Sequence, residues 1–238
     1  TRSRTRTRSR SRTRTHPLPA RPPSARSEGA NMGPCMSKSK SRTVMVCGLD
    51  NAGKSTLLCA LPEVNSRIAK AAKHCGLTVA STLPTPGMQL VNMSMAKRGR
   101  DEDSLIKRLC SRRSKINWHI WDLSGQGKHR PLWLYYCSQV HAIIFVVDLT
   151  DPARIAIARD ELVNLTENPI VLERSIPFLF FANKSDAAAD MDNALSLEDV
   201  KLAFGFDSLH CPRKMVTSRW DASDGVREGF QWLTDEVG

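Results

Sequence analysis

The sequence lacks a long apolar run. Its longest uninterrupted apolar stretch, residues 142–147, is far shorter than the roughly 20 residues that cross a bilayer. The N-terminus also lacks the basic start and apolar middle of a signal peptide. These absences argue against a membrane-spanning or secreted protein, so we expect a cytoplasmic one.

Closely spaced cysteine pairs are missing as well. The chain has seven cysteines, and none forms a Cys-x-x-Cys pair that would begin a zinc site or a redox motif. We therefore expect reduced thiols, as is usual in the cytosol.

Acidic residues are scarce in three segments. The chain carries 35 Lys and Arg against 24 Asp and Glu, a formal net charge of +11. Residues 1–31, 32–42 and 96–115 hold +8, +3 and +5 of that charge, so the remainder is −5. The basic character thus belongs to appendages and not to the predicted globular part.

Residues 1–31 alternate Arg with Ser or Thr and then become rich in proline. Such a segment has no hydrophobic period with which to form a core, so we predict a disordered extension. An arginine-rich arm can bind RNA through phosphate contacts. The simpler interpretation is that Met32 is the natural start, and we do not expect a nucleic acid partner.

Short apolar runs alternate with helical patterns from residue 42 onward. The runs at 44–47, 116–121, 143–147, 178–182 and 214–217 predict strands, and the patterns at 54–73, 131–138, 153–168, 197–204 and 225–236 predict helices. Alternating strands and helices predict an α/β fold with a mainly parallel sheet covered by helices on both faces. Ligands of such folds bind at the carboxyl ends of the strands.

A phosphate-binding loop is predicted directly after the first strand. Residues 48–55, Gly-Leu-Asp-Asn-Ala-Gly-Lys-Ser, fit the pattern G-x-x-x-x-G-K-[ST] between a strand and a helix. In this pattern Lys54 lies between the outer phosphates, and the Ser55 hydroxyl binds magnesium. The alternative is a glycine-rich turn before a buried helix. The predicted phosphate-binding residues are Gly48, Asp50, Asn51, Ala52, Gly53, Lys54, Ser55, Thr56 and, from a later loop, Gly125.

Polar residues after the strand at 178–182 predict the base that is recognised. Asn183 can brace the loop, the Lys184 stem can cover a ring, and the Asp186 carboxylate can accept two hydrogen bonds from guanine. Adenine lacks that pair of donors. A polar turn after a strand is the alternative.

A third element follows the strand at 116–121. Asp122 can hold magnesium through water, the Gly125 N–H can meet a terminal phosphate, and Gln126 can orient an attacking water. The alternative is a simple strand, turn and helix start in which Gly125 is the breaker.

With these motifs, residues 42–238 resemble the Arf and Arf-like small GTPases. The resemblance is carried by G-L-D-N-A-G-K-S at 48–55, L-P-T-P-G at 83–87, D-L-S-G-Q at 122–126, R-P-L-W at 130–133, F-A-N-K-S-D at 181–186 and E-G-F-Q-W-L at 228–233. The run S-G-Q-G at 124–127 resembles the Arf-like branch associated with Bardet-Biedl syndrome. The resemblance as a whole implies a P-loop NTPase of the small-GTPase fold, with six strands, over residues 43–238.

The resemblance also implies roles for further residues. Thr85 would add its hydroxyl to magnesium, and Thr217 and Ser218 would lie in the loop beside the guanine. Asp50 matches an acidic residue of the family's phosphate loop. No arginine suggests itself as a finger in cis, so we expect slow hydrolysis until a partner supplies one.

The function that the resemblance implies is a monomeric, GTP-dependent switch with GTP or GDP and Mg²⁺. In its GTP state it would attach peripherally to membranes and recruit a coat complex of the BBSome type in ciliary trafficking, under an exchange factor and a GTPase-activating protein. Three alternatives remain: a scaffold that retains GTP and hardly hydrolyses it, an RNA-binding protein that uses the arginine arm, and a P-loop nucleoside kinase, which would leave 183–186 unexplained.

Three features depart from the family pattern. About ten extra residues lie around 65–79, a basic insertion spans 96–115, and the short segment 32–42 replaces the usual amphipathic helix. In that segment Gly33 fits a myristoylation pattern and Cys35 would permit a second acyl chain, with Lys38, Lys40 and Arg42 attracting anionic lipid. Pro34 argues against acylation at Gly33.

Overall fold

The structure is a computed structural model, and it describes residues 40–61, 85, 87–96, 115–220 and 222–238. The chain divides into two units, residues 1–36 and 37–238, and all described residues belong to the second. The N-terminal extension, the lipidation candidates Gly33 and Cys35, the extra residues at 65–79 and residues 97–114 of the basic insertion lie outside the described residues.

A six-stranded sheet forms the centre of the described part. Its strands lie in the order β2-β3-β1-β4-β5-β6. β2 pairs antiparallel with β3, and every other pair is parallel, so the predicted fold class is confirmed. The strands are β1 (Lys40–Cys47), β2 (Met88–Ala96), β3 (Lys115–Leu123), β4 (Ala142–Asp148), β5 (Phe178–Asn183) and β6 (Arg213–Thr217).

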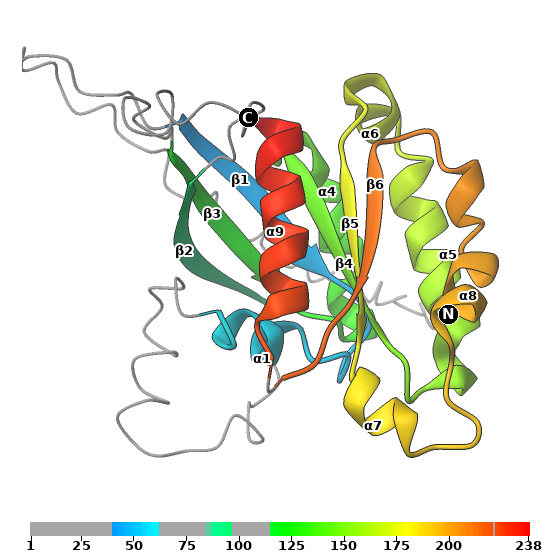
Figure 1. The fold of residues 1–238 in the computed structure, drawn as a ribbon. Helices are drawn as coiled ribbons and strands as arrows, with labels where there is room; N and C mark the ends of the chain where they lie inside the picture. The colour runs from blue at the N-terminus through cyan, green and yellow to red at the C-terminus, as the bar shows by residue number, and fades with distance from the viewer. Residues whose placement is uncertain (1–39, 62–84, 86, 97–114, 221) are drawn as a thin grey trace, which may run out of the picture. The chain divides into compact units, whose positions relative to one another are not determined.

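Helices cover both faces of this sheet (Figure 1). α1 (Lys54–Cys59) and α9 (Asp224–Val237) pack on one face, where Trp118 Nε1 donates to Thr234 Oγ1 at 3.1 Å. α4 (Pro131–Tyr136), α5 (Ile155–Thr166), α6 (Pro169–Arg174) and α8 (Leu197–Ala203) pack on the other. The short α7 (Ser185–Ala189) follows β5, and 3₁₀ turns lie at Gly127–His129, Cys137–Gln139, Pro152–Arg154 and Phe206–Ser208.

The first helix is shorter than predicted. The pattern at 54–73 predicted one long helix, but α1 ends at Cys59. Pro62 follows two residues beyond its C-cap, Ala60, and proline disfavours the helical conformation of the residue before it. Residues 62–73 of the predicted helix lie outside the described residues.

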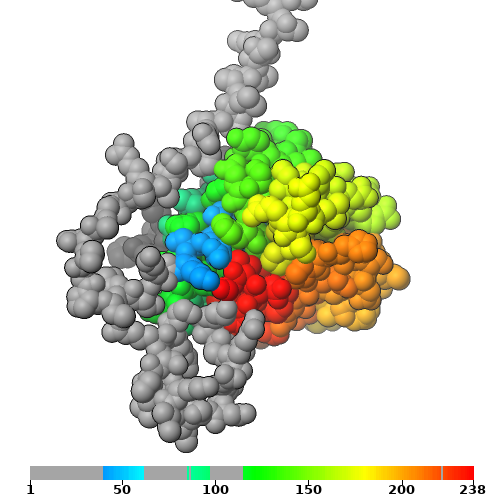
Figure 2. Space-filling model, turned by 90° about the horizontal axis from the view of Figure 1, so that it is seen from above, coloured from blue at the N-terminus to red at the C-terminus, as the bar shows by residue number. Residues whose placement is uncertain are grey.

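The first strand is longer than predicted. It begins at Lys40, inside the segment expected to precede the domain, because β3 offers parallel partners from Ile116 onward. Lys40 Nζ donates to the Gly238 carbonyl at 2.9 Å, and Arg42 Nε donates to the Val237 carbonyl at 3.3 Å. Figure 2 shows this start of β1 in blue against the end of α9 in red. These two cations thus cap a helix C-terminus.

The helix predicted at 153–168 is present as a 3₁₀ turn and α5, and a further helix that was not predicted follows it. A 3₁₀ turn precedes α5, which ends at Thr166, and α6 starts at Pro169. The Asn168 side chain accepts from the Ile170 N–H at 3.0 Å and so caps α6. An Asn at the N-cap followed by a Pro at N1 is a recognised signal of a helix start. The spacing of apolar residues, on which the prediction rested, does not contain this signal.

Candidate nucleotide-binding site

The polar segments singled out in the sequence meet at one edge of the sheet. The parallel registers pair Val46 with Asp122, Asp148 with Asn183, and Ala182 with Thr217. The loops after β1, β3, β5 and β6 therefore leave the same edge side by side. This is the edge at which ligands of open α/β sheets bind.

The loop between β1 and α1 folds around Lys54. The ammonium is buried, and its Nζ donates to the carbonyls of Gly48 at 3.0 Å and Leu49 at 2.7 Å. Burial lowers the pKa of Lys54, while the nearby Asp122 carboxylate opposes that shift. Asn51 and Gly53 have φ angles of 64° and 84°. Such a curved backbone directs N–H groups toward a common centre, the geometry of an anion-binding nest.

Three predicted magnesium ligands come together beside Lys54. The Ser55 hydroxyl donates to Asp122 Oδ2, and Thr85 Oγ1 lies 3.0 Å from Ser55 Oγ. Asp122 is 1% exposed, and its Oδ1 is buried without a hydrogen-bond partner. Burial raises the pKa of this carboxyl, although the Ser55 hydroxyl counteracts the shift. Two hydroxyls and a carboxylate with an unused oxygen fit the hard oxygen ligands that Mg²⁺ prefers.

Gly125 lies directly against the phosphate loop. A Cβ at this position would approach Asp50 N to 2.4 Å and the Gly48 carbonyl oxygen to 2.5 Å, so no side chain fits there. The next residue, Gln126, is half-buried, and its N–H lies 3.4 Å from Ser124 Oγ. The structure thus places both predicted residues beside the loop that holds Lys54.

The base end of the site is braced by Asn183. Its Nδ2 donates to the Ala52 carbonyl at 2.9 Å, and its Oδ1 accepts from Ser218 Oγ at 3.0 Å. Both side chains are buried. A Cβ on Gly53 would lie 2.5 Å from Asn183 Nδ2. One asparagine therefore joins the phosphate loop to the loops after β5 and β6.

Lys184 and Asp186 flank this brace. Lys184 adopts a left-handed conformation with φ 63°, and its Nζ pairs with Asp148 Oδ2 at 2.7 Å. Asp186 Oδ1 is buried without a hydrogen-bond partner. Thr217 ends β6 with an exposed side chain, whereas Ser218 is buried. The carboxylate assigned to guanine thus has an unused acceptor, as that role requires.

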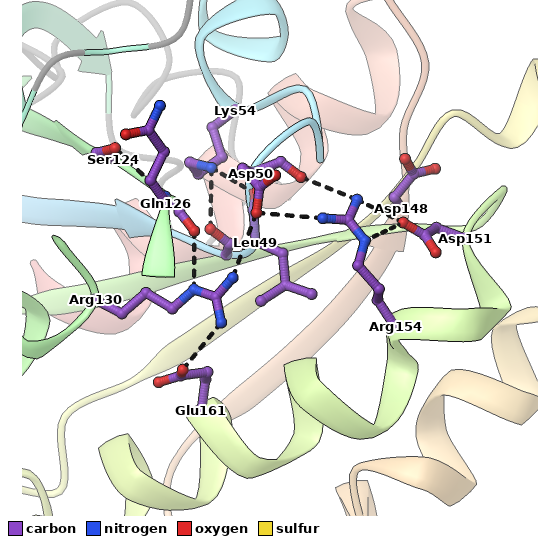
Figure 3. A network of polar contacts seen from close by, with 12 residues as sticks. Leu49, Asp50, Lys54, Ser124, Gln126, Arg130, Asp148, Asp151, Arg154 and Glu161 are labelled. Carbon is purple, nitrogen blue, oxygen red and sulfur yellow. Dashed lines mark hydrogen bonds and ion pairs between the residues drawn. The ribbon is translucent and has the colours of Figure 1, made fainter. Parts of the chain in front are cut away.

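The sequence interpretation missed two arginines that reach the phosphate loop (Figure 3). Arg130 contacts Asp50, Glu161 and the Gly125 carbonyl, while Arg154 contacts Asp50 and Asp151. The sequence suggested no arginine as a finger in cis. Both guanidinium groups are paired with carboxylates in the structure, so neither is placed as a free finger. The R-P-L-W motif at 130–133 includes Arg130, but the sequence interpretation gave that residue no role in the site.

Comparisons with known proteins agree with this geometry. The model of the ADP-ribosylation factor family matches residues 31–237. The chain is 30% identical to ADP-ribosylation factor-like protein 6 of Danio rerio over 205 residues, which cover 84% of this chain and 90% of the relative. The chain belongs to the Arf family. It is also 30% identical to ADP-ribosylation factor J of Dictyostelium discoideum over 83% of its length and 86% of that protein.

A solved structure shares the fold of this Arf-family chain. The Arl6 (BBS3) small GTPase of Trypanosoma brucei, with the bound nucleotide analogue GppNp, matches with a TM-score of 0.59 and 25% identity. The match covers 83% of this chain and 98% of the trypanosomal one.

Membership in the family establishes the chemistry. The chain is a small GTPase that uses GTP or GDP with Mg²⁺ and converts GTP to GDP and phosphate. In the part of the chain that the structure describes, no helix has the length and apolarity needed to span a bilayer. The four cysteines in that part, at 47, 59, 137 and 211, are free thiols, as predicted.

Proposed function

We propose that this GTPase is an Arf-like molecular switch whose nucleotide site lies along the carboxyl edge of the sheet. The observation that carries the proposal is a pair of buried carboxylate oxygens without hydrogen-bond partners, Asp122 Oδ1 and Asp186 Oδ1. A buried unpaired acceptor costs free energy unless a ligand satisfies it. One of the two lies at the predicted magnesium end of the site, and the other lies at the predicted base end.

The phosphates would be held by the loop after β1 and by Gly125. Lys54 would exchange its carbonyl partners for phosphate oxygens, and the backbone N–H groups of the loop would supply the remaining donors. Thr56, in the first turn of α1, and Asp50 and Asn51 at the loop tip complete the phosphate side. Gly125 lies close enough to Asp50 N that its own N–H can point into the same space.

Mg²⁺ would be held by Ser55, Thr85 and, through water, Asp122. These residues already contact one another. When bound, the ion neutralises charge on the phosphate oxygens. Because burial raises the pKa of Asp122, this carboxyl would have to lose its proton in order to hold the ion.

Guanine would be recognised by Asp186, with Asn183 bracing the pocket. Lys184 would cover one face of the ring, a role supported by the pairing of its Nζ with Asp148. Ser218 would fix the Asn183 amide, and the backbone around Thr217 and Ser218 would line the base. Gln126 would orient the attacking water.

Downstream, we propose that the GTP state recruits a membrane coat of the BBSome type at the cilium or ciliary base. The designations of the fish and trypanosomal relatives support this assignment. An exchange factor and an activating protein would set the cycle, and acylation at Gly33 or Cys35 would supply peripheral membrane attachment. Metabolic labelling with a myristate analogue, with Gly33→Ala as the control, tests that last step.

Nucleotide specificity and turnover test the switch itself. We expect Mg²⁺-dependent binding of GTP and GDP in preference to ATP. In Gln126→Leu, GTP affinity should stay nearly unchanged, whereas single-turnover hydrolysis should fall by at least about tenfold, or 1.4 kcal/mol of transition-state stabilisation. Equal affinities for ATP and GTP would refute guanine recognition. Equal rates with an activating protein present would favour a scaffold over a switch.

A further inference from the structure

We propose that Arg130 is a positioning residue for GTP hydrolysis, holding the Gly125–Gln126 peptide against the phosphate loop. The inference deepens the proposed function, because it rests on the role assigned to Gln126. Its basis is a set of hydrogen bonds that the start of α4 makes to the loop after β3.

Arg130, the N-cap of α4, and Trp133, in its first turn, hold successive carbonyls of that loop. Trp133 Nε1 donates to the Ser124 carbonyl at 3.1 Å, and Arg130 Nε donates to the Gly125 carbonyl at 2.9 Å. A peptide unit is planar, so fixing its C=O also fixes the N–H on its other side. Trp133 therefore sets the direction of the Gly125 N–H, and Arg130 sets that of the Gln126 N–H.

The other two nitrogens of Arg130 anchor the guanidinium. Nη2 contacts Asp50 Oδ1 at 3.3 Å, and Nη1 contacts Glu161 Oε1 at 3.2 Å. The side chain is 15% exposed, and Figure 3 shows it between the loop, Asp50 and the helix that carries Glu161. All three nitrogens are thus used, each on a different segment. A lysine ammonium cannot reproduce that planar fork.

This anchoring should matter more for hydrolysis than for binding. Most of the affinity for GTP would come from Lys54, Asn183 and Asp186, which Arg130 does not contact. Of the proposed phosphate-binding residues, Arg130 contacts the Asp50 side chain and the Gly125 carbonyl, and neither atom would bind phosphate. The rate depends on where Gln126 places a water, and an error of about 1 Å in such a position can cost a hundredfold. A residue that fixes the Gln126 backbone therefore acts on the transition state and not on the bound ground state.

Arg130→Lys is the informative variant, because it keeps the charge and loses the fork. We expect single-turnover hydrolysis to fall by about ten- to a hundredfold, while the affinities for GTP and GDP change little. Amide hydrogen exchange over residues 124–127 should become faster. Arg159→Lys is the control: this arginine lies on α5, is half-exposed and pairs with its neighbour Asp160, so its rate should equal that of wild type.

A double-mutant cycle separates positioning from a merely structural role. If Arg130 acts through Gln126, adding Arg130→Lys to Gln126→Leu should cause little further loss. Three results would overturn the proposal. The first is an unchanged hydrolysis rate in Arg130→Lys, and the second is a loss in the double variant, relative to Gln126→Leu, as large as the loss that Arg130→Lys causes in wild type. The third is a fall in nucleotide affinity and melting temperature that parallels the fall in rate. A Gln126→Leu variant with the wild-type rate would refute the role of Gln126, and this proposal with it. By contrast, a reduced hydrolysis rate in Gln126→Leu together with a wild-type rate in Arg130→Lys would refute only the role of Arg130.

Discussion

The two ends of the nucleotide site are built in opposite ways. At the base end, Asn183 and Ser218 are buried and bonded to each other, and they rest on the ends of β5 and β6. At the phosphate end, the exposed tip of the loop at Asp50 is held by charged side chains from distant segments, such as Arg130. The base end is thus prearranged by the sheet. The phosphate end is assembled by contacts that can be broken one at a time, which suits the part of a switch that must sense a lost phosphate.

Each end nevertheless contains one buried carboxylate oxygen without a partner. At the base end the neighbouring contacts are rigid, so we expect substitutions there to reduce the specificity for guanine. Substitutions at the phosphate end should reduce the Mg²⁺ dependence of nucleotide binding or the rate of GTP hydrolysis. The following substitutions test that division.

The largest effect is expected from Asp186→Asn. The amide removes an acceptor and adds a donor, so GTP should bind weakly and xanthosine triphosphate, whose O2 accepts, should bind better. Loss of a matched polar pair can change discrimination by roughly 10⁴-fold. Competition binding with GTP and xanthosine triphosphate measures it, and an unchanged preference for GTP would exclude Asp186 as the base reader.

Asp122→Asn should act on the phosphate end through the metal. Mg²⁺ should increase nucleotide affinity by a smaller factor in the variant than in wild type. We expect the two factors to differ by at least about tenfold, which is a loss of about 1.4 kcal/mol in the coupling between metal and nucleotide binding. Nucleotide release rates with Mg²⁺ and with a chelator measure that coupling, and Ser94→Ala on the distant part of β2 serves as a control. Retained Mg²⁺ dependence would remove Asp122 from the metal site.

The same variant has a distinct pH signature in the nucleotide-free protein. The pKa of Asp122 is raised above its ordinary value of 3.8, so the folded state binds the proton more tightly than the unfolded chain. Its contribution to stability is therefore present at low pH and is lost as pH rises from 3.8 through the raised value. The melting temperature of wild type minus that of Asp122→Asn should fall over this window, and a rising difference would contradict the burial argument.

The sequence predicted the base end more completely than the phosphate end. The motifs at 48–55 and 181–186 indicated which residues would lie close together, because parallel strands place their carboxyl ends at one edge of the sheet. The ties of Arg130 and Arg154 to Asp50 depend on tertiary packing between α4, the 3₁₀ turn Pro152–Arg154 and the phosphate loop. No local pattern specifies that packing. The strand β2 was expected only from the family. Its alternation of polar and apolar residues, with one face exposed, is itself a strand signal, which a search for continuous apolar runs does not detect.

A smaller effect is expected from Ser218→Ala. This change removes the hydrogen bond from Ser218 Oγ to Asn183 Oδ1, which is 3.0 Å long and buried. A bond of this kind contributes about 1 kcal/mol to stability, so the loss of prearrangement in the base pocket should weaken nucleotide binding by at most about fivefold. Both GTP and GDP should weaken equally, because the contact lies at the base end. A loss confined to GTP in equilibrium binding would show that the brace also controls the phosphate end.

The smallest effect on the site is expected from removing residues 97–114. Ala96 and Lys115 pair directly across the antiparallel β2–β3 ladder, so a two-residue Asn-Gly turn can join them. The strands also keep two cross-strand side-chain hydrogen bonds: Asn92 Oδ1 accepts from His119 Nδ1 at 2.9 Å, and Ser94 Oγ donates to Asn117 Oδ1 at 2.8 Å. We therefore expect unchanged GTP affinity and melting temperature.

The deletion removes seven basic and three acidic residues, a net charge of +4. Each cation that reaches an anionic surface contributes about 1 kcal/mol, so binding to anionic vesicles at low salt should weaken by at least about fivefold. A variant of full length in which serines replace the seven cations separates charge from length, and it should bind vesicles as weakly as the deletion. A large drop in melting temperature in the deletion alone would show that the insertion packs on the domain. The comparison between the two ends of the site would then have to include the insertion, because it would be stabilising β3, the strand that carries Asp122.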